Sequence, residues 1–364
     1  MEKAGERLRH DNTMEDQDLV KHHYNRRGLV GPQSMLFRKS HPMSWRQVSG
    51  NYQTWELNAL SIVPSDAESP HGEPVKLFYS DDLALWLSRR KESMPYFFRN
   101  CDADELHLIC RGEMTYETDF GNIEVGEREM LLIPKGVTYR VLMRKPDDSF
   151  RIIYESGPEV FLVPAEMIET YYRMGRPALD PAKLKRPHLP KGPKPEGSFE
   201  VRVKYNGAFS EFLGEKSTIV YDYYPLDAEV IDGYVPVFKF GATDVERFPG
   251  TPAPFLGGAY LDNKDSLAWT LHLAGGGGRG YRGTPVHRDA DVDELRYNAS
   301  GPKMGAFLFT PHATDHGWGR GYTKRERNRP QDDYDLGDVV SVYTIKPLKG
   351  TSTSFTFAKP AAAG

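Results

Sequence analysis

The residues whose types could do chemistry in this chain concentrate between positions 287 and 316. His287 and His316 bound this segment, and Glu294 lies between them in an acidic run. Neutral imidazoles and a carboxylate suit a borderline divalent metal ion. If only a few protein groups hold the ion, coordination positions stay open where two reactants can meet. The segment therefore indicates a metal centre.

The same acidic run permits a calcium-loop interpretation, because Asp289, Asp291 and Asp293 alternate along it. A calcium loop of that kind needs a glycine for its sharp turn and flanking helices. Here Glu294 stands in place of the glycine, and no helical pattern flanks the run. The sequence does not favour calcium.

Short strands must position these residues. Between Phe97 and Tyr154, runs such as LHLIC, EMTYET, MLLIP and FRIIYE alternate with glycine and proline turn signals, which is typical of an antiparallel meander. Strand patterns return after Phe199 in FEVRVKY, STIVYDYY, GAFLFT and VVSVYTI. With 34 Gly, 27 Pro and 20 Tyr, the composition also fits many short strands and tight turns. We expect an all-β fold.

A weak internal repeat relates the two halves. The segment FRNCDADEL at 98–106 has the spacing of HRDADVDEL at 287–295, and PKGVTY at 134–139 corresponds to PHATDH at 311–316. Two matched blocks predict duplicated β-barrels. We divide the chain into an N-terminal arm (1–40), a first barrel (41–176), a linker rich in Pro, Lys and Gly (177–198) and a second barrel (199–364).

The second half resembles the cupin pattern, in which His-x-His and Glu come from one motif and a further histidine ends a Pro-x-Gly-x-x-His motif. His287 stands at the first histidine position, Asp289 replaces the second, Glu294 is the glutamate, and His316 ends the second motif with Ala313 in place of glycine. The resemblance implies double-stranded β-helix (jelly-roll) barrels and a metal held by His287, Glu294 and His316. Two imidazoles and one carboxylate are the ligand type of non-haem Fe(II) oxygenases, although other divalent transition metals accept similar ligands.

The first half offers a poorer set at the equivalent positions: Phe98, Asn100, Glu105 and Tyr139. These residues cannot assemble a comparable site, and the nearby His107 adds only one imidazole. We therefore expect the first barrel to be free of metal.

Both halves together look like homogentisate 1,2-dioxygenase and its relatives, through the 97–141 block, VRVKYNGAF, TPVHRDADVDEL and FTPHATDHG. The resemblance implies that a metal-free first barrel supports an iron site in the second. In this family the spacing between the first two ligands is one residue shorter, which leaves Asp293 as an alternative to Glu294. The triplet Thr310-Pro311-His312 looks like the family's ligand triplet, which leaves His312 as an alternative to His316. We favour Glu294 and His316.

The substrate is less constrained. The family has a histidine that acts on the ring hydroxyl, but the segment that corresponds here, DAEVIDGYVPVFKF, contains none. Metal binding itself, or His312 as a base, could deprotonate a hydroxyl. Arg282 and Arg288 could pair with a substrate carboxylate, since guanidinium groups match carboxylates bidentately. We expect catalytic roles for His312 and Arg288, and substrate contacts from Arg282, Asp289 and His312.

These observations predict an Fe(II)-dependent ring-cleaving dioxygenase whose partners are O2 and a hydroxylated aromatic acid or diphenol. One alternative is a cupin metalloenzyme that performs another oxidation, an isomerisation or a hydrolysis. Another is a metal-free binding bicupin. The resemblance also implies homo-oligomers.

Charge and composition exclude other classes. A net charge of −4 offers no field for gripping nucleic acid, and no apolar run approaches the roughly 20 residues that span a bilayer. The polar N-terminus does not read as a signal peptide, and the two cysteines, Cys101 and Cys110, form no disulfide framework. We expect a cytoplasmic protein without membrane or nucleic-acid partners.

Overall fold

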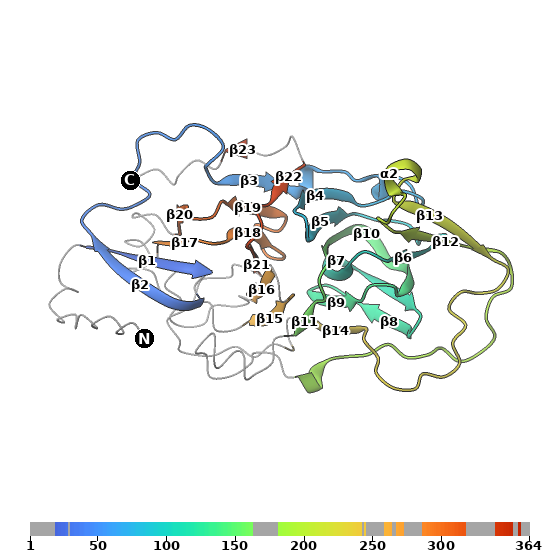
Figure 1. Ribbon diagram of the computed structural model, residues 1–364. Helices are drawn as coiled ribbons and strands as arrows, with labels where there is room; N and C mark the ends of the chain where they lie inside the picture. Colours follow the sequence, from blue (N-terminus) through green and yellow to red (C-terminus); the bar gives the residue numbers. More distant parts are fainter. Residues whose placement is uncertain are drawn as a thin grey trace.

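The computed structural model describes residues 19–27, 30–162, 181–241, 244, 258–263, 267–272, 286–317, 339–351 and 356–357. Their regular structure is almost all β-strand, joined by turns and irregular loops, which confirms the expected all-β fold (Figure 1). The helical segments described are single turns: η2 (Ala59–Ser61), η3 (Ser65–Ala67), η5 (Pro181–Lys183) and α2 (Ser210–Leu213). None of them has the length and apolar character that a membrane-spanning helix needs.

The first barrel is built from the largest sheet found among the described residues. Its strands are β4 (Val75–Tyr79), β5 (Leu83–Ser88), β6 (Phe97–Asn100), β7 (Asp104–Thr118), β8 (Gly121–Val125), β9 (Glu129–Ile133), β10 (Thr138–Ser156), β12 (Phe199–Lys204), β13 (Lys216–Tyr221), β14 (Phe238–Gly241) and β22 (Lys349–Gly350). The long strands β7 and β10 pair antiparallel over most of their length. In β7, buried and half-exposed residues alternate from Cys110 onward, as a strand with one face on a core requires.

Two sheets form the second barrel. One contains β3 (Trp55–Asn58), β11 (Phe161–Leu162), β15 (Gly258–Asp262), β16 (Leu267–His272), β18 (Asp293–Asn298), β19 (Ala306–Thr310), β21 (Val339–Thr344) and β23 (Thr356–Phe357). The other contains β1 (Val20–Arg27), β2 (Val30–Arg38), β17 (Val286–Asp289) and β20 (Asp315–His316). Figure 1 shows the four-stranded sheet at the end of the molecule away from the first barrel, beside the eight-stranded sheet.

Strand pairing confirms the internal repeat. Phe98 on β6 is the register partner of Tyr139 on β10, and His287 on β17 is the partner of His316 on β20. Strands β6 and β17 each also have a parallel neighbour that belongs to an antiparallel pair: β12, which pairs with β13, lies beside β6, and β1, which pairs with β2, lies beside β17. The two barrels therefore share one plan of strands.

The boundaries of the two barrels differ from the expected division of the sequence. Strands β12, β13 and β14 follow the expected boundary at 198/199 but pair within the first barrel. Strands β1 and β3 precede residue 60 but pair with β17 and β19 of the second barrel. Each half of the chain thus contributes strands to the other barrel. Pairing between strands far apart in the sequence therefore sets the boundaries of the barrels. The described part of the linker also lies along the first barrel, since His188 and Lys185 form bridges with Asn122 and Lys239.

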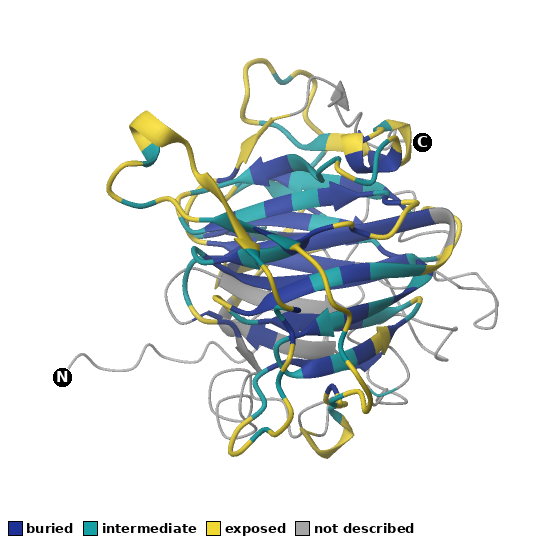
Figure 2. Cartoon of the chain, turned by 90° about the vertical axis from the view of Figure 1, so that its right-hand side faces the viewer, coloured by how far each residue is buried: buried dark blue, intermediate teal, exposed yellow. Residues whose placement is uncertain are grey.

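The apolar core is shared between the barrels. One buried cluster contains Phe78 and Leu106 of the first barrel together with Leu295 and Phe307 of the second. Buried residues fill the strands in Figure 2, and exposed residues lie mainly in the surrounding loops. Because the two barrels bury this surface together, the first barrel supports the sheet that carries Glu294.

Candidate metal centre

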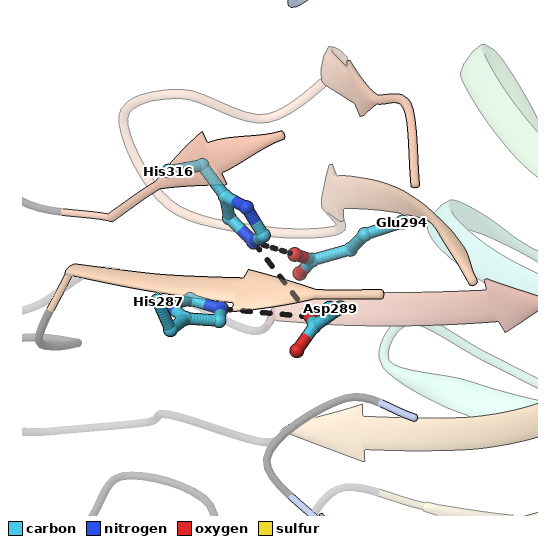
Figure 3. A group of neighbouring side chains, drawn as sticks. All are labelled: His287, Asp289, Glu294 and His316. Atoms are coloured by element: carbon cyan, nitrogen blue, oxygen red, sulfur yellow. Dashed lines mark hydrogen bonds and ion pairs between the residues drawn. The ribbon is translucent and has the colours of Figure 1, made fainter. Parts of the chain in front are cut away.

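Three short strands place four potential donor side chains at one point between the two sheets of the second barrel. Alternation along β17 puts His287 and Asp289 on the same face of that strand. His316 is the register partner of His287 on β20, and Glu294 comes from β18 in the opposing sheet. Figure 3 shows the four side chains pointing toward one another.

The four donors form a compact and buried group. One ligand atom from each of them lies within 4.8 Å of all the others. The imidazole Nε2 of His316 is 2.7 Å from Oε2 of Glu294 and 3.9 Å from Oδ2 of Asp289, whereas Nε2 of His287 is 3.7 Å from the same Asp289 oxygen. The exposed fractions are 2% for Asp289, 3% for His287, 8% for Glu294 and 9% for His316. This is the only such group found among the residues that the structure describes.

The closest pair, His316 and Glu294, shares a proton in the protein without metal. Burial by itself would lower the pKa of His316, but the hydrogen bond and charge of Glu294 outweigh it and raise that pKa to about 9. Burial likewise favours a neutral Glu294, yet the hydrogen bond from His316 and the charges of both histidines lower the pKa of Glu294 to about 2. Without metal, this pair is therefore an imidazolium and a carboxylate near neutral pH.

The carboxylate of Asp289 is incompletely satisfied by the protein. Asn25 Nδ2 donates a long 3.4 Å hydrogen bond to Oδ1, while Oδ2 is buried and has no hydrogen-bond partner. Burial raises the pKa of Asp289 to about 6; the nearby charge of His316 opposes this shift, and that of Glu294 adds to it. A buried carboxylate oxygen without a donor is costly unless a cation satisfies it. The unpaired oxygen faces two imidazoles and a second carboxylate, so the donor set fits a divalent metal.

Neighbouring groups orient the donors. The Nδ1 of His316 is 2.9 Å from the carbonyl oxygen of Thr314, which leaves Nε2 directed at the group. The Oε1 of Glu294 accepts long hydrogen bonds from Ser341 Oγ at 3.3 Å and Tyr343 OH at 3.4 Å. These contacts leave His316 and Glu294 facing each other with their second polar atoms engaged by the protein.

The geometry separates the alternatives that the sequence left open. Asp293 accepts backbone hydrogen bonds from His312 and Leu348, both at 2.8 Å, so its carboxylate is used to join two loops. The imidazole of His312 lies 2.9 Å from Asp293, and its side chain is 52% exposed. Neither residue belongs to the donor group. Glu294 and His316, rather than Asp293 and His312, therefore lie where a metal would be held.

Arg288 lies on the opposite face of β17 from His287 and Asp289. Its guanidinium donates to both carboxylate oxygens of Asp315, at 2.8 and 2.7 Å. His22 Nε2 also lies 2.9 Å from Asp315. This placement argues against the expected catalytic role of Arg288, because strand alternation turns its side chain away from the donors. Arg282 lies outside the described residues.

The first barrel contains a different buried network at the equivalent positions. Glu105 accepts hydrogen bonds from Asn100 Nδ2 at 2.9 Å and from Tyr139 OH at 2.7 Å. His107 Nε2 is 3.2 Å from the same carboxylate, and its Nδ1 is 3.0 Å from the hydroxyl of Tyr116. Protein groups thus satisfy this glutamate, and the described residues of this barrel contain no cluster of potential metal ligands. The expected absence of metal there remains a prediction.

Sequence reasoning missed two features of the centre. It assigned Asp289 a substrate contact, although Asp289 lies inside the donor group. It also overlooked strand β1, whose Asn25 contacts Asp289 and whose His23 is the register partner of His287. The first feature could have been found, because Asp289 occupies the second ligand position of the cupin motif. The second has no local signal, because β1 is separated from β17 by most of the chain.

Comparison with known proteins finds one matching family model and a relative whose name describes a dioxygenase. Residues 75–165 match the family model described as homogentisate 1,2-dioxygenase N-terminal. The "Putative dioxygenase SSO1533" of Saccharolobus solfataricus is 25% identical over 260 residues, which cover 66% of this chain and 63% of that protein. The match thus spans less than two thirds of the length of this relative.

Solved structures give lower sequence identities. Protein Ylba from E. coli is 10% identical with a TM-score of 0.41, covering 83% of this chain and 95% of that one. A point mutant of the oxalate decarboxylase OxdC from Bacillus subtilis is 13% identical with a TM-score of 0.39, covering 83% of this chain and 80% of that one.

Proposed function

We propose that this chain, an all-β bicupin similar to the homogentisate 1,2-dioxygenase family, is an Fe(II)-dependent dioxygenase that cleaves the ring of a hydroxylated aromatic acid or diphenol. The observation that carries the proposal is the buried group of two imidazoles and two carboxylates, one of which has an unpaired oxygen. The match of residues 75–165 to the homogentisate 1,2-dioxygenase N-terminal model and the name of the Saccharolobus solfataricus relative support the reaction class.

The donors have distinct roles in this proposal. His287, Glu294 and His316 would hold the metal, and Asp289 would supply a fourth donor, the second carboxylate oxygen. With these four side chains as its only protein ligands, a divalent metal would keep coordination positions open for reactants. Ferrous iron supplies a route for electrons between an electron-rich ring and O2. Homo-oligomer formation stays a prediction from the family resemblance.

The proposed reaction needs no reductant other than the substrate. One carbon–carbon bond of the ring breaks, and each of its two carbons gains one oxygen atom from O2. The substrate supplies the four electrons that reduce O2, so atoms and electrons balance. The buried donors exclude bulk water from the place where this occurs.

The protein's own groups must also handle protons. His316 carries a proton in the metal-free form, because Glu294 raises its pKa to about 9. That proton must leave Nε2 before this atom can act as a ligand. Glu294 is already ionised, since its pKa is about 2. Loading with metal at neutral pH therefore releases a proton and fixes His316 as a neutral imidazole.

Oxygen consumption tests this proposal. Anaerobically Fe(II)-loaded protein is mixed with O2 and homogentisate, gentisate, hydroquinone, catechol or 3-hydroxyanthranilate. We expect uptake with at least one compound, and loss of that uptake in His287→Ala. Tyr139→Phe removes the hydroxyl that donates to Glu105 in the first barrel. It serves as the matched control and should retain iron and activity.

A second metal-dependent function remains a candidate because Asp289 gives the centre a fourth donor. Carboxylate-rich sites also suit metals that do not exchange electrons, and such a site could support an isomerisation or a hydrolysis. Stoichiometric metal without O2 uptake across the panel would favour this candidate. Absence of bound metal, with His287→Ala equal to wild type in ligand affinity, would favour the metal-free binding protein.

A further inference from the structure

A row of side chains crosses the outer sheet of the second barrel and leads away from the candidate metal centre. Met35 on β2 is the register partner of His23 on β1, His23 is the partner of His287 on β17, and His287 is the partner of His316 on β20. The four strands lie next to one another in this order. His23 is therefore the next residue of the row beyond the metal donors.

His23 shares the face of the sheet that carries the donors. Register partners on neighbouring strands point their side chains to the same side, and successive residues alternate. Asn25, two residues along β1, confirms the orientation, because its side chain donates to Asp289. His22 occupies the opposite face, where its ring lies 2.9 Å from Asp315. The imidazole of His23 thus faces the interior that contains His287.

The position of His23 is close to the metal centre but outside the donor group. Neighbouring strands of a sheet are about 4.8 Å apart, so the His23 side chain stands one strand away from that of His287. The group of mutually close ligand atoms includes His287 but not His23. His23 is also half-buried, whereas the four donors are buried. These features suit a residue that contacts a molecule held at the metal.

The first barrel uses the equivalent position differently. Arg202 on β12 is the register partner of Phe98, as His23 is of His287. Its guanidinium carbon lies 3.6 Å from the ring centre of Tyr96, and its Nε donates to Glu200 at 2.6 Å. In the first barrel this position therefore holds a guanidinium that contacts the ring of Tyr96 and the carboxylate of Glu200.

We propose that His23 is a substrate-binding residue whose imidazole hydrogen-bonds an oxygen substituent of the substrate. The proposal rests on the proposed function and narrows its substrate class. The substrate carries one oxygen that reaches the metal centre and a second polar substituent, a hydroxyl in the case of a diphenol acid, that reaches His23. An aromatic acid without the second hydroxyl lacks this contact.

Binding measurements with paired ligands test the role of His23. Anaerobic Fe(II)-loaded wild type and His23→Leu are titrated with gentisate and with salicylate, which lacks one hydroxyl of gentisate. Homogentisate and 2-hydroxyphenylacetate form a second pair. In at least one pair, we expect the Kd of the dihydroxy compound to rise about 10- to 100-fold in His23→Leu, the usual effect of losing a hydrogen bond to a polar ligand group, while that of its monohydroxy partner changes less than about threefold.

Two further variants separate recognition from structure. His23→Gln retains hydrogen-bonding atoms and should recover part of the lost affinity. Tyr24→Phe alters the next residue of β1 on the opposite face and should match wild type for every ligand. Metal content is measured in each variant and should remain at the wild-type level in His23→Leu.

Several outcomes would overturn the proposal. Wild-type affinities in His23→Leu, or equal losses for both members of each pair, would exclude a contact with the second hydroxyl. Loss of metal in His23→Leu would assign His23 to the metal centre itself. If wild type holds iron but binds neither pair of ligands, both the proposed substrate class and the proposed role of His23 are wrong. If wild type binds the ligands and consumes O2 while His23→Leu is unchanged, the proposed function stands and only the role of His23 is wrong.

Discussion

The two barrels of this protein use one framework for two different buried sites. In the first, Asp104 accepts the backbone N–H groups of Lys135 and Val160, both at 2.8 Å. In the second, Asp293 accepts those of His312 and Leu348 at the same distance. An aspartate before the central glutamate therefore joins the same two loops in each barrel.

The turn before the last motif residue is also shared. The backbone N–H of Gly136 donates to the backbone carbonyl of Asn100 at 2.7 Å, and that of Ala313 donates to the backbone carbonyl of Asp289 at 2.7 Å. Both residues have positive φ, +83° and +60°. The two turns thus share a backbone conformation, although one has Gly136 and the other Ala313 at this position.

The difference lies in what satisfies the central glutamate. Tyr139 and Asn100 donate hydrogen bonds to Glu105, whereas Glu294 faces His316 and an incompletely paired Asp289. Buried carboxylates need donors or cations. The first barrel supplies neutral hydrogen-bond donors to its glutamate, and the second surrounds its glutamate with potential metal ligands. A few side chains on one shared backbone plan therefore distinguish a structural network from a candidate metal centre.

The largest expected effect comes from giving the second barrel the residues of the first. His287→Phe with His316→Tyr replaces both imidazoles by the side chains found at positions 98 and 139. Because two of the four donors are lost, we expect bound iron to fall below about a tenth of the wild-type level. Metal analysis after anaerobic loading and desalting measures it. Retention of iron by this variant would refute the assigned ligands.

Asp289→Asn tests the fourth donor and copies Asn100 of the first barrel. We expect metal affinity to drop about 10- to 100-fold, a loss typical of groups that support a metal site, as measured by chelator competition. The metal-free protein should become more stable by about 1 kcal/mol, because a buried carboxylate with an oxygen that accepts no hydrogen bond is replaced by a neutral amide. The reverse change, Asn100→Asp, should destabilise the protein and leave metal affinity unaltered. Unchanged affinity in Asp289→Asn would exclude Asp289 as a ligand.

The pH dependence should report the His316–Glu294 pair. The folded-state pKa of His316 is about 9, above its usual 6.5, so the pair stabilises the metal-free protein fully below pH 6.5 and loses this contribution as pH rises through 9. We expect the free energy of unfolding to fall by about 1 to 3 kcal/mol across that window. Denaturant unfolding at several pH values measures it, with His316→Tyr as the variant in which the fall should disappear.

Metal binding should show the opposite pH trend. Because the ion displaces the proton of His316, apparent affinity should rise by up to about tenfold per pH unit between pH 7 and 9. Titration in a weakly buffered indicator solution should show about one proton released at pH 7. A pH-independent affinity would contradict the protonated state of His316.

The smallest expected effect concerns the shared turn. Ala313 has a positive φ of +60°, a conformation that glycine adopts more easily, so Ala313→Gly should stabilise the protein by about 1 kcal/mol. Gly136→Ala should destabilise the first barrel by a similar amount, because its φ of +83° strains an alanine even though no atom lies within 4 Å of the added methyl group. Thermal denaturation of both variants measures the contrast. Equal shifts of the same sign would show that the two turns are not equivalent.

Much of the fold and the donor group was accessible from the sequence. The β-strand alternation predicted the all-β fold, and the repeat of DADEL with DVDEL predicted equivalent barrels. The cupin motif predicted His287, Glu294 and His316 as metal ligands. Strand alternation could also have excluded Arg288 from the interior, because it lies between two inward residues. These inferences succeed because a strand's period of two and a motif's spacing are local properties.

Only the tertiary structure decided which distant strands complete the centre. Asn25 reaches Asp289 although 264 residues separate them, and the β12–β13 hairpin completes the first barrel from beyond the expected boundary. Parallel pairing between remote strands depends on the global packing of the sheets and leaves no periodic signal in either segment. The types of the donor residues and the strands that carry them were therefore predictable from local sequence patterns. The fold decided that Asp289 joins them, that Asp293 and His312 do not, and that His23 stands beside them.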